Sequence, residues 1–208
     1  QSVRRTRGSV ILPPLLMLTD RSQLPPGRRL VEHTAYAARA GVRAVVLRER
    51  DLPAAERHVL AYELSALLDP LGAALIVASP GIPGVDGIHL RSDDELPDTR
   101  SGVVGRSCHS AAELERARDE RVDYVVLGPV AATRSKPGYG PALGPSGLRQ
   151  MLAAHTGPTV YALGGVTADN ATDWLDAGAG GVAVMGELMR PDDPGTVATR
   201  LLDRIEAT

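Results

Sequence analysis

The chain contains 208 residues, of which 43% are hydrophobic and 23% are charged, and its formal net charge at pH 7 is −2. This composition excludes an intrinsically disordered chain, and the length is sufficient for one large hydrophobic core. The small net charge and the aromatic content of 3%, without any Phe, argue against nucleic acids and membranes as partners. A single cysteine, Cys108, excludes an internal disulfide and a cysteine-based zinc site, which favours a cytoplasmic location.

We expect one domain over residues 1–208, in which residues 1–13 form an extended N-terminal segment. The basic start is followed by a short apolar stretch, residues 10–18, which Pro13 and Pro14 interrupt. A signal peptide needs a longer apolar region, and a membrane helix needs about 20 apolar residues. Because the first residue is Gln1, we expect that a start methionine is missing.

Short apolar runs recur along the chain and alternate with longer amphipathic stretches. Most of these runs are nearly continuous Val, Leu, Ile and Ala, which is typical of parallel strands that are covered on both faces. We therefore expect strands at residues 15–19, 43–48, 73–78, 87–90, 103–107, 124–127, 159–163 and 181–185.

The stretches between the runs predict helices at residues 28–40, 53–68, 111–119, 146–155, 168–177 and 194–206. Ser110 and Glu113 have the spacing of a capping box at a helix N-terminus. Gly41 and Gly178 stand where a helix C-terminus favours a left-handed residue. Residues 79–85 are too few for a complete helix between the third and fourth strands.

Eight strands that alternate with helices predict an α/β protein with a single (β/α)8 TIM barrel, for which about 200–250 residues are typical. An open, doubly wound sheet is the structural alternative. In a barrel, functional groups lie at the carboxyl ends of the strands. The polar residues that follow each strand are therefore the candidates for a site.

Arginine and histidine side chains follow several predicted strands. Arg48 and Arg50 flank Glu49, and alternation places both arginines on one side of the chain, where they can bind phosphate or pyrophosphate. A surface ion-pair cluster is the alternative. His89 is interpreted as a core histidine with satisfied hydrogen bonds, and His109 as either a general acid or a capping residue.

Glycines at two strand ends favour phosphate binding. Gly164 and Gly165 follow the seventh strand, and Gly186 follows the eighth. Glycines allow backbone N–H groups to approach an anion, and the seventh and eighth strands provide the phosphate site of many barrels. A tight turn is the alternative interpretation of the Gly-Gly pair.

Residues 133–144 contain hydroxyl groups, two cations and three glycines, and they predict either a lid over an anionic substrate or a solvated loop. Asp93 and Asp94 are candidates for water-mediated metal binding, with capping of a helix N-terminus as the alternative. Cys108 is interpreted as a small buried residue.

Seven segments carry a family pattern: LMLTD at 16–20, VLRER at 46–50, DGIHL at 86–90, VGRSCHS at 104–110, DYVVLGPV at 123–130, ALGGV at 162–166 and AGGVAVM at 179–185. In this order the segments resemble the thiamine phosphate synthase/TenI family. The resemblance implies a TIM barrel that binds hydroxyethylthiazole phosphate or a thiamine phosphate. It implies that the phosphate lies at Gly164, Gly165, Val184 and Met185 or Gly186.

Synthases of this family join a pyrimidine methyl pyrophosphate to thiazole phosphate, and Mg²⁺ assists the departure of pyrophosphate. The synthase residues that the resemblance carries over are Arg48, Ser107, Thr133, Ser135 and Lys136. Arg50 stands where synthases usually have lysine, which keeps the charge but not the geometry.

The end of the third strand departs from the synthase pattern. Synthases place an Asn-Asp-Arg segment there for pyrimidine binding and metal coordination, whereas this chain has Ala78, Ser79 and Pro80. Asp94 matches the other metal carboxylate, although Ser92 replaces the customary Gln. Mg²⁺ is therefore expected only if the protein is a synthase.

The TenI branch includes a tautomerase that aromatises a thiazole carboxylate phosphate by proton transfer. Residues 48–50 and 105–110 resemble this branch more closely. Pro129 occupies the place of the TenI histidine at the end of the sixth strand, so we hypothesise that His109 moves the proton instead. The catalytic candidates are His109, Arg48, Lys136 and Ser107.

The leading interpretation is therefore a TenI-like protein of thiamine biosynthesis, with thiazole tautomerase as its candidate activity. The first alternative is a divergent Mg²⁺-dependent synthase that uses Arg48, Arg50, Lys136 and Asp94 around pyrophosphate. The second is a non-catalytic regulatory protein that binds thiamine phosphate, and the third is a different phosphate-binding barrel, such as a sugar-phosphate isomerase. In each case the ligand is a small phosphorylated molecule, and assembly into a homo-oligomer stays open.

Overall fold

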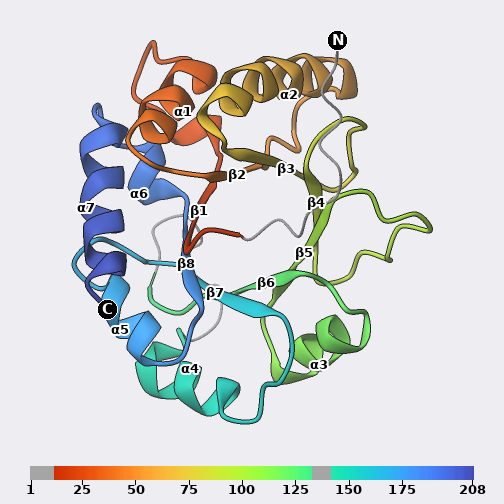
Figure 1. Cartoon of the computed structure of the whole chain (residues 1–208), viewed down its shortest axis with the longest axis vertical. Coiled ribbons are helices and arrows are strands. Elements are labelled where there is room, and N and C mark those ends of the chain that lie inside the picture. The colour runs from red at the N-terminus through yellow and green to blue at the C-terminus, as the bar shows by residue number, and fades with distance from the viewer. Residues whose placement is uncertain (1–11, 133–141) are drawn as a thin grey trace.

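A computed structural model of the chain describes residues 12–132 and 142–208. Figure 1 shows the strands arranged as a ring with helices outside it, and the sheet is a closed barrel in the order β1-β2-β3-β4-β5-β6-β7-β8. Neighbouring strands are parallel throughout, including β1 with β8. The predicted TIM barrel is confirmed, and the open sheet is excluded.

The strands are β1 (Leu15–Leu18), β2 (Ala44–Leu47), β3 (Ala74–Ala78), β4 (Gly87–Leu90), β5 (Val103–Cys108), β6 (Tyr124–Leu127), β7 (Thr159–Leu163) and β8 (Gly181–Val184). Each agrees with its predicted run to within one residue at either end. Side chains alternate between two apolar clusters: Leu16 and Leu18 lie in the barrel interior, whereas Leu15 and Met17 pack against the helices.

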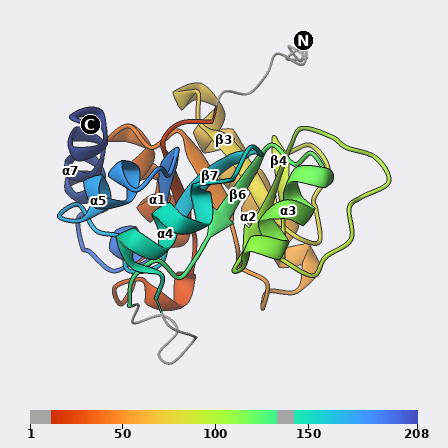
Figure 2. The same cartoon turned by 90° about the horizontal axis from the view of Figure 1, so that it is seen from below.

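The helices are α1 (Leu30–Arg39), α2 (Ala54–Leu68), α3 (Ala111–Asp119), α4 (Gly144–Leu152), α5 (Ala171–Asp176), α6 (Gly186–Met189) and α7 (Pro194–Glu206). Figure 2 shows this layer from below, with α7, α5 and α4 on one side and α3 on another. The sequence did not predict α6. In the part of the chain that the structure describes, no helix has the length and apolar character needed to cross a membrane.

Loops replace helices after two strands. Residues 79–86 and 91–102, which follow β3 and β4, contain no helix. The first loop is as short as predicted, but Asp93 and Asp94 open no helix, so their interpretation as capping residues is wrong. The barrel therefore departs from a complete (β/α)8 pattern on the side of β4 (Figure 1).

The helix ends agree with most of the predicted signals. The Ser110 hydroxyl accepts a hydrogen bond from the N–H of Glu113, and the Glu113 carboxylate accepts one from the N–H of His109. In a standard capping box the carboxylate accepts from the N–H of the N-cap residue, here Ser110, whereas Glu113 accepts from His109, the residue before the N-cap. Gly41 and Gly178 have φ angles of 116° and 103°, so both end their helices in the left-handed region.

Two helices begin or end away from their predicted bounds. α4 begins at Gly144 and ends at Leu152, whereas the prediction was 146–155. α5 begins only at Ala171, because Asn170 closes a turn with Thr167. The Asn170 Oδ1 accepts the Thr167 N–H at 2.8 Å, and the Asn170 N–H donates to the Thr167 carbonyl at 3.3 Å. Such side-chain bonds compete with the first turn of a helix.

Cys108, the last residue of β5, is fully buried, as predicted. Its thiol lies 3.5 Å from the carbonyl oxygen of Glu113 in α3. Burial, together with the negative charge of Glu113, raises the pKa of the Cys108 thiol to about 12. The thiol is therefore protonated at neutral pH and packs as a small apolar group.

Two tyrosines fill the interior of the barrel. Tyr124 and Tyr161 are fully buried and meet edge to face, with ring centroids 5.7 Å apart. Glycines on the neighbouring strands make room for the rings, since a Cβ on Gly105 would overlap the Tyr124 ring and one on Gly181 would lie 2.5 Å from the Tyr161 ring. The Tyr161 hydroxyl donates to the Pro13 carbonyl at 2.8 Å. The interior is therefore a packed core rather than a channel.

We expect Gly105→Ala to lower the free energy of unfolding by about 1–3 kcal/mol, because the added methyl group overpacks the core. Urea unfolding followed by circular dichroism measures this change. Gly147→Ala is the matched control, since its Cβ would lie in α4 at an ordinary 3.5 Å from Leu143, where alanine favours the helix. Equal stability of the two variants would contradict the packing described here.

Candidate active site

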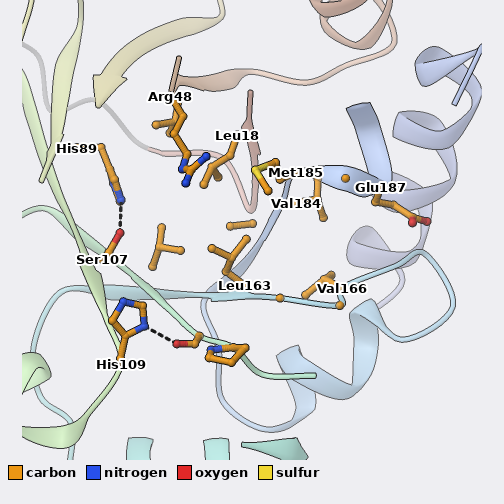
Figure 3. A pocket seen from close by; sticks show the side chains of 18 of the residues that line it. Leu18, Arg48, His89, Ser107, His109, Leu163, Val166, Val184, Met185 and Glu187 are labelled. Atoms are coloured by element: carbon orange, nitrogen blue, oxygen red, sulfur yellow. Dashed lines mark hydrogen bonds between the residues drawn. The ribbon is translucent and has the colours of Figure 1, made fainter. Parts of the chain in front are cut away.

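A cavity of about 600 Å³ opens at the carboxyl ends of the strands. This volume lies within the range of about 300–1,000 Å³ that is usual for small-molecule sites. Five of the apolar residues that line it continue the barrel interior: Leu18, Val46, Val126, Leu163 and Ala183. Polar groups from the ends of β2, β4, β5, β7 and β8 surround this apolar base (Figure 3).

The end of β2 carries two arginines that face the cavity. Arg48 and Arg50 both line it, as alternation predicts, and Figure 3 shows Arg48 reaching into it. The intervening Glu49 is buried on the other side, where its carboxylate accepts hydrogen bonds from the backbone and guanidinium of Arg21. The ion-pair interpretation therefore applies to Glu49 and not to the two arginines.

A third arginine shares this wall. Arg91, directly after β4, lines the cavity together with Arg48 and Arg50. Burial, together with the positive charges of Arg91 and Arg48, lowers the pKa of Arg50 to about 10. The Nε of Arg50 is buried and has no hydrogen-bond partner among the described residues. Guanidinium groups in this arrangement are suited to bind phosphate or carboxylate oxygens.

The end of β7 brings backbone N–H groups to the cavity. Gly164 and Gly165 have φ angles of 103° and 65°, and a Cβ on Gly165 would lie 2.5 Å from the carbonyl oxygen of Ala132. The tight turn that was the alternative interpretation is therefore present. Within residues 12–132 and 142–208, the N–H groups of Gly165 and Val166 donate to no acceptor. Such N–H groups are suited to bind an anion.

The end of β8 leads directly into the short helix α6. Val184, Met185 and Gly186 line the cavity, and in the described structure the N–H of Gly186 also donates to no acceptor. Strand ends seven and eight with a short extra helix are the usual phosphate site of barrels. Arg190 lines the cavity as well, and its Nη1 donates to Gln23 at 2.6 Å. Sequence reasoning missed Arg190 because α6 was not predicted.

A buried chain of hydrogen bonds joins the barrel interior to the cavity. His89 Nδ1 lies 3.0 Å from the Tyr124 hydroxyl, and His89 Nε2 lies 2.9 Å from Ser107 Oγ (Figure 3). Burial lowers the pKa of His89 to about 3, and the positive charges of Arg50 and Arg106 contribute. The ring is neutral at pH 7, so one nitrogen donates and the other accepts. His89 is thus a hydrogen-bonded core histidine, as interpreted from the sequence, and it orients Ser107 at the cavity.

His109 lies on the wall beside the end of β6. Its Nδ1 is 2.6 Å from the carbonyl oxygen of Gly128, and Pro129, the next residue, also lines the cavity. The side chain that caps α3 belongs to Ser110, so the capping interpretation of His109 is wrong. The imidazole faces the ligand space, where proton transfer to or from a bound molecule is geometrically feasible.

The loop after β4 is held by two arginines from outside it. Buried Arg106 of β5 donates to the carbonyl oxygens of Arg91 and Asp94 at 2.7 and 2.9 Å. Arg116 of α3 donates to the same Asp94 carbonyl at 3.0 Å. Glu120 forms salt bridges of 2.7 Å with both arginines. These contacts hold Arg91 at the cavity although the loop itself contains no helix.

Asp94, the metal candidate, is not among the described residues that line the cavity. Its Oδ2 accepts hydrogen bonds from Ser79 Oγ at 2.5 Å and from the N–H of Arg91 at 2.8 Å. Ser79 stands where the resemblance requires a second metal carboxylate. The described residues contain no group of three or more His, Cys, Asp or Glu that could hold a metal ion. This donor set does not fit the Mg²⁺ coordination that the resemblance implies.

Thr133, Ser135 and Lys136 fall within residues 133–141, outside the described residues, and so does most of the predicted lid at 133–144.

The closed parallel barrel, with a cavity at the carboxyl ends of its strands, defines a TIM-barrel protein. A family model described as thiamine monophosphate synthase matches residues 15–188. The chain therefore belongs to the thiamine monophosphate synthase family, and the predicted resemblance is confirmed.

Relatives that match at least 90% of the chain are named as synthases. The chain is 37% identical over 201 residues to a putative thiamine-phosphate synthase of Geobacter sulfurreducens, covering 90% of this chain and 92% of the relative. It is 35% identical over 204 residues to a thiamine-phosphate synthase of Methanoculleus marisnigri, covering 93% and 95%. A solved thiamine phosphate pyrophosphorylase from Pyrococcus furiosus superimposes with a TM-score of 0.80 at 25% identity, covering 93% and 95%. These names favour the synthase alternative over the TenI-like interpretation that the sequence placed first.

Because His89 is neutral in the folded protein, we expect its ring to take up no proton between about pH 8 and pH 5. The ¹⁵N signals of the ring should stay constant in an NMR titration, with a His89→Asn variant to assign them. The unfolded chain binds this proton near pH 6.5, so stability should fall as the pH falls from there towards about 3. Ring signals that titrate near pH 6.5 would contradict this result.

Proposed function

We propose that this protein is a thiamine-phosphate synthase, which joins a pyrimidine methyl pyrophosphate to thiazole phosphate. The observation that carries the proposal is a single cavity with two anion-binding regions. The N–H groups at the ends of β7 and β8, which have no acceptor among the described residues, form one region, and Arg48, Arg50 and Arg91 form the other. The names of relatives that cover at least 90% of the chain support the same activity.

In this reaction the thiazole nitrogen forms a bond to the methylene carbon of the pyrimidine, and the bond from that carbon to the pyrophosphate oxygen breaks. The electron pair leaves with pyrophosphate, so negative charge develops at the leaving group. Arg48 and Arg50 stabilise that charge, and the N–H groups of Gly165 and Gly186 hold the thiazole phosphate. The apolar base of the cavity brings the two rings together and excludes water.

The pyrimidine side of the site differs from the pattern that the resemblance implies. Ala78, Ser79 and Pro80 are absent from the described cavity wall, and Ser79 bonds to Asp94 instead. Beside the end of β4, Ser107 presents to the cavity a hydroxyl that His89 orients. We assign the pyrimidine contact to Ser107.

A Gly165→Ala variant tests the phosphate position. The methyl group would meet the Ala132 carbonyl in a left-handed conformation, so we expect the KM for thiazole phosphate to rise about tenfold or more. Gly84→Ala is the matched control, because Gly84 also has a positive φ, 86°, but its Cβ would meet no atom within 4 Å. Formation of thiamine phosphate from both substrates is measured.

No product from the wild-type protein would rule out the proposed reaction. Equal KM values for the two glycine variants would instead rule out the phosphate position while leaving the reaction intact.

A thiazole tautomerase of the TenI type is the second candidate, and the position of His109 favours it. Its imidazole faces the cavity beside Pro129, which replaces the histidine of that branch. An imidazole can remove and return a proton near neutral pH. The carboxylate of the thiazole carboxylate phosphate would then meet the arginines, and the phosphate would lie at β7 and β8.

If His109 moves this proton, His109→Ala should lower the kcat of tautomerisation by about 10²–10⁴-fold. The exposed His58 on α2 provides the control variant His58→Ala, which should keep the wild-type rate. Aromatisation is followed by absorbance with the thiazole carboxylate phosphate as substrate. Full turnover by His109→Ala excludes this role, and binding without turnover in both assays leaves the non-catalytic, regulatory alternative.

A further inference from the structure

The arginine end of the cavity carries three positive charges, and Asp94 is an electrostatic neighbour of two of them but forms no salt bridge with either among the described residues. Arg48, Arg50 and Arg91 line the cavity, and none of them forms a salt bridge with a described residue. The buried Nε of Arg50 also has no hydrogen-bond partner in the described part of the chain. Arg48 and Arg50 are partly buried and Arg91 is exposed, so the repulsion is strongest between the first two, and an anion bound between the three side chains would relieve it.

The carboxylates around this wall are engaged elsewhere or screened. They are Asp20, Glu49, Asp51, Asp93 and Asp94. Asp20 accepts hydrogen bonds within the turn that follows β1, and Glu49 and Asp51 both bind Arg21. Asp94 accepts a hydroxyl and a backbone N–H, while Asp93 lines the cavity but is exposed, so solvent screens its charge.

Among the described residues, the same region does not provide a metal site. The Ser79 hydroxyl donates to Asp94, so one oxygen of the carboxylate that would bind a cation is already occupied. Two guanidinium groups, of Arg50 and Arg91, also act on this carboxylate electrostatically, which opposes the approach of a second cation.

We propose that Arg48, Arg50 and Arg91 bind the pyrophosphate group directly and without a divalent cation, with Arg91 supplying the charge that a metal ion would otherwise supply. This inference rests on the proposed function for the identity of the diphosphate, and it adds how the leaving group is held. Guanidinium groups bind phosphate oxygens in pairs, which gives geometry as well as charge.

Arg91 is held in place for this role. Arg106 and Arg116, joined through Glu120, donate to the carbonyl oxygens of the loop at Arg91 and Asp94. The backbone of the loop at Arg91 is therefore held in place before the anion binds, so binding costs little backbone conformational entropy.

Calorimetric titration with inorganic pyrophosphate in the presence of EDTA tests the inference. We expect the wild-type protein to bind, and Arg91→Ala to bind about tenfold more weakly or worse, since it loses charge-assisted hydrogen bonds. Arg91→Lys should bind at an intermediate strength, because it keeps the charge but not the planar fork. The control is Arg204→Ala on α7, which removes the same charge at an exposed position and should bind within twofold of wild type.

Repeating the titration with added Mg²⁺ distinguishes direct binding of pyrophosphate from binding through a metal ion. We expect Mg²⁺ to weaken binding, because it competes for pyrophosphate oxygens in solution. Binding that requires Mg²⁺, no binding under either condition, or equal losses in Arg91→Ala and Arg204→Ala would overturn the inference. Product assays separate the two proposals: synthesis that requires Mg²⁺ contradicts only this inference, and metal-free pyrophosphate binding without synthesis contradicts only the proposed function.

Discussion

The packing of the Tyr124 ring against Gly105 connects the interior of the barrel with its cavity. Gly105 leaves the space for this ring on the adjacent strand, and the Tyr124 hydroxyl then reaches His89. His89 in turn orients Ser107 at the cavity wall. Because the ring and the imidazole are both buried, the hydrogen bonds between them cannot be exchanged for water at low cost. The same packing that closes the barrel therefore fixes one side of the site.

The two proposed anion-binding regions are built by different physical means. At β7 and β8 the donors are backbone N–H groups, whose positions follow from strand ends that a closed barrel holds rigidly. At β2 and β4 the donors are long side chains that follow the strand ends, and Arg91 belongs to a loop that contains no helix. Arg106 gives this loop the support that a helix would normally give, by binding carbonyl oxygens from within β5. A buried charge is costly, and here it is compensated by carbonyl groups and by Glu120.

The sequence predicts the strands to within one residue because their runs are buried on both faces, so hydrophobicity alone marks them. It also predicts which strand ends meet at the cavity, since a parallel barrel brings all carboxyl ends to one face. Helix α6 was missed because its four residues are too few to show a period. Arg106, by contrast, had a signal: a charged residue inside an apolar strand must find partners, and here they are the carbonyl groups of the β4 loop.

The reaction itself could not be predicted from the sequence. It depends on whether Ser79 faces a metal or Asp94, which is a matter of side-chain direction, and on Thr133, Ser135 and Lys136, which lie outside the described residues. The choice between synthase and tautomerase also depends on the direction of the His109 side chain. Pro129 stands in the place of the TenI histidine, so that position does not identify the proton-transfer group. The cytoplasmic location stays a prediction of the sequence, which left assembly into a homo-oligomer open.

The burial of Cys108 determines how the protein responds to oxidants. Alkylating reagents and peroxides attack the thiolate, and burial keeps this thiol protonated beneath α3. Copies of the chain therefore gain no disulfide link through Cys108 while they stay folded. Thiol labelling would consequently report on opening of the barrel, because the label reaches Cys108 only when α3 separates from β5.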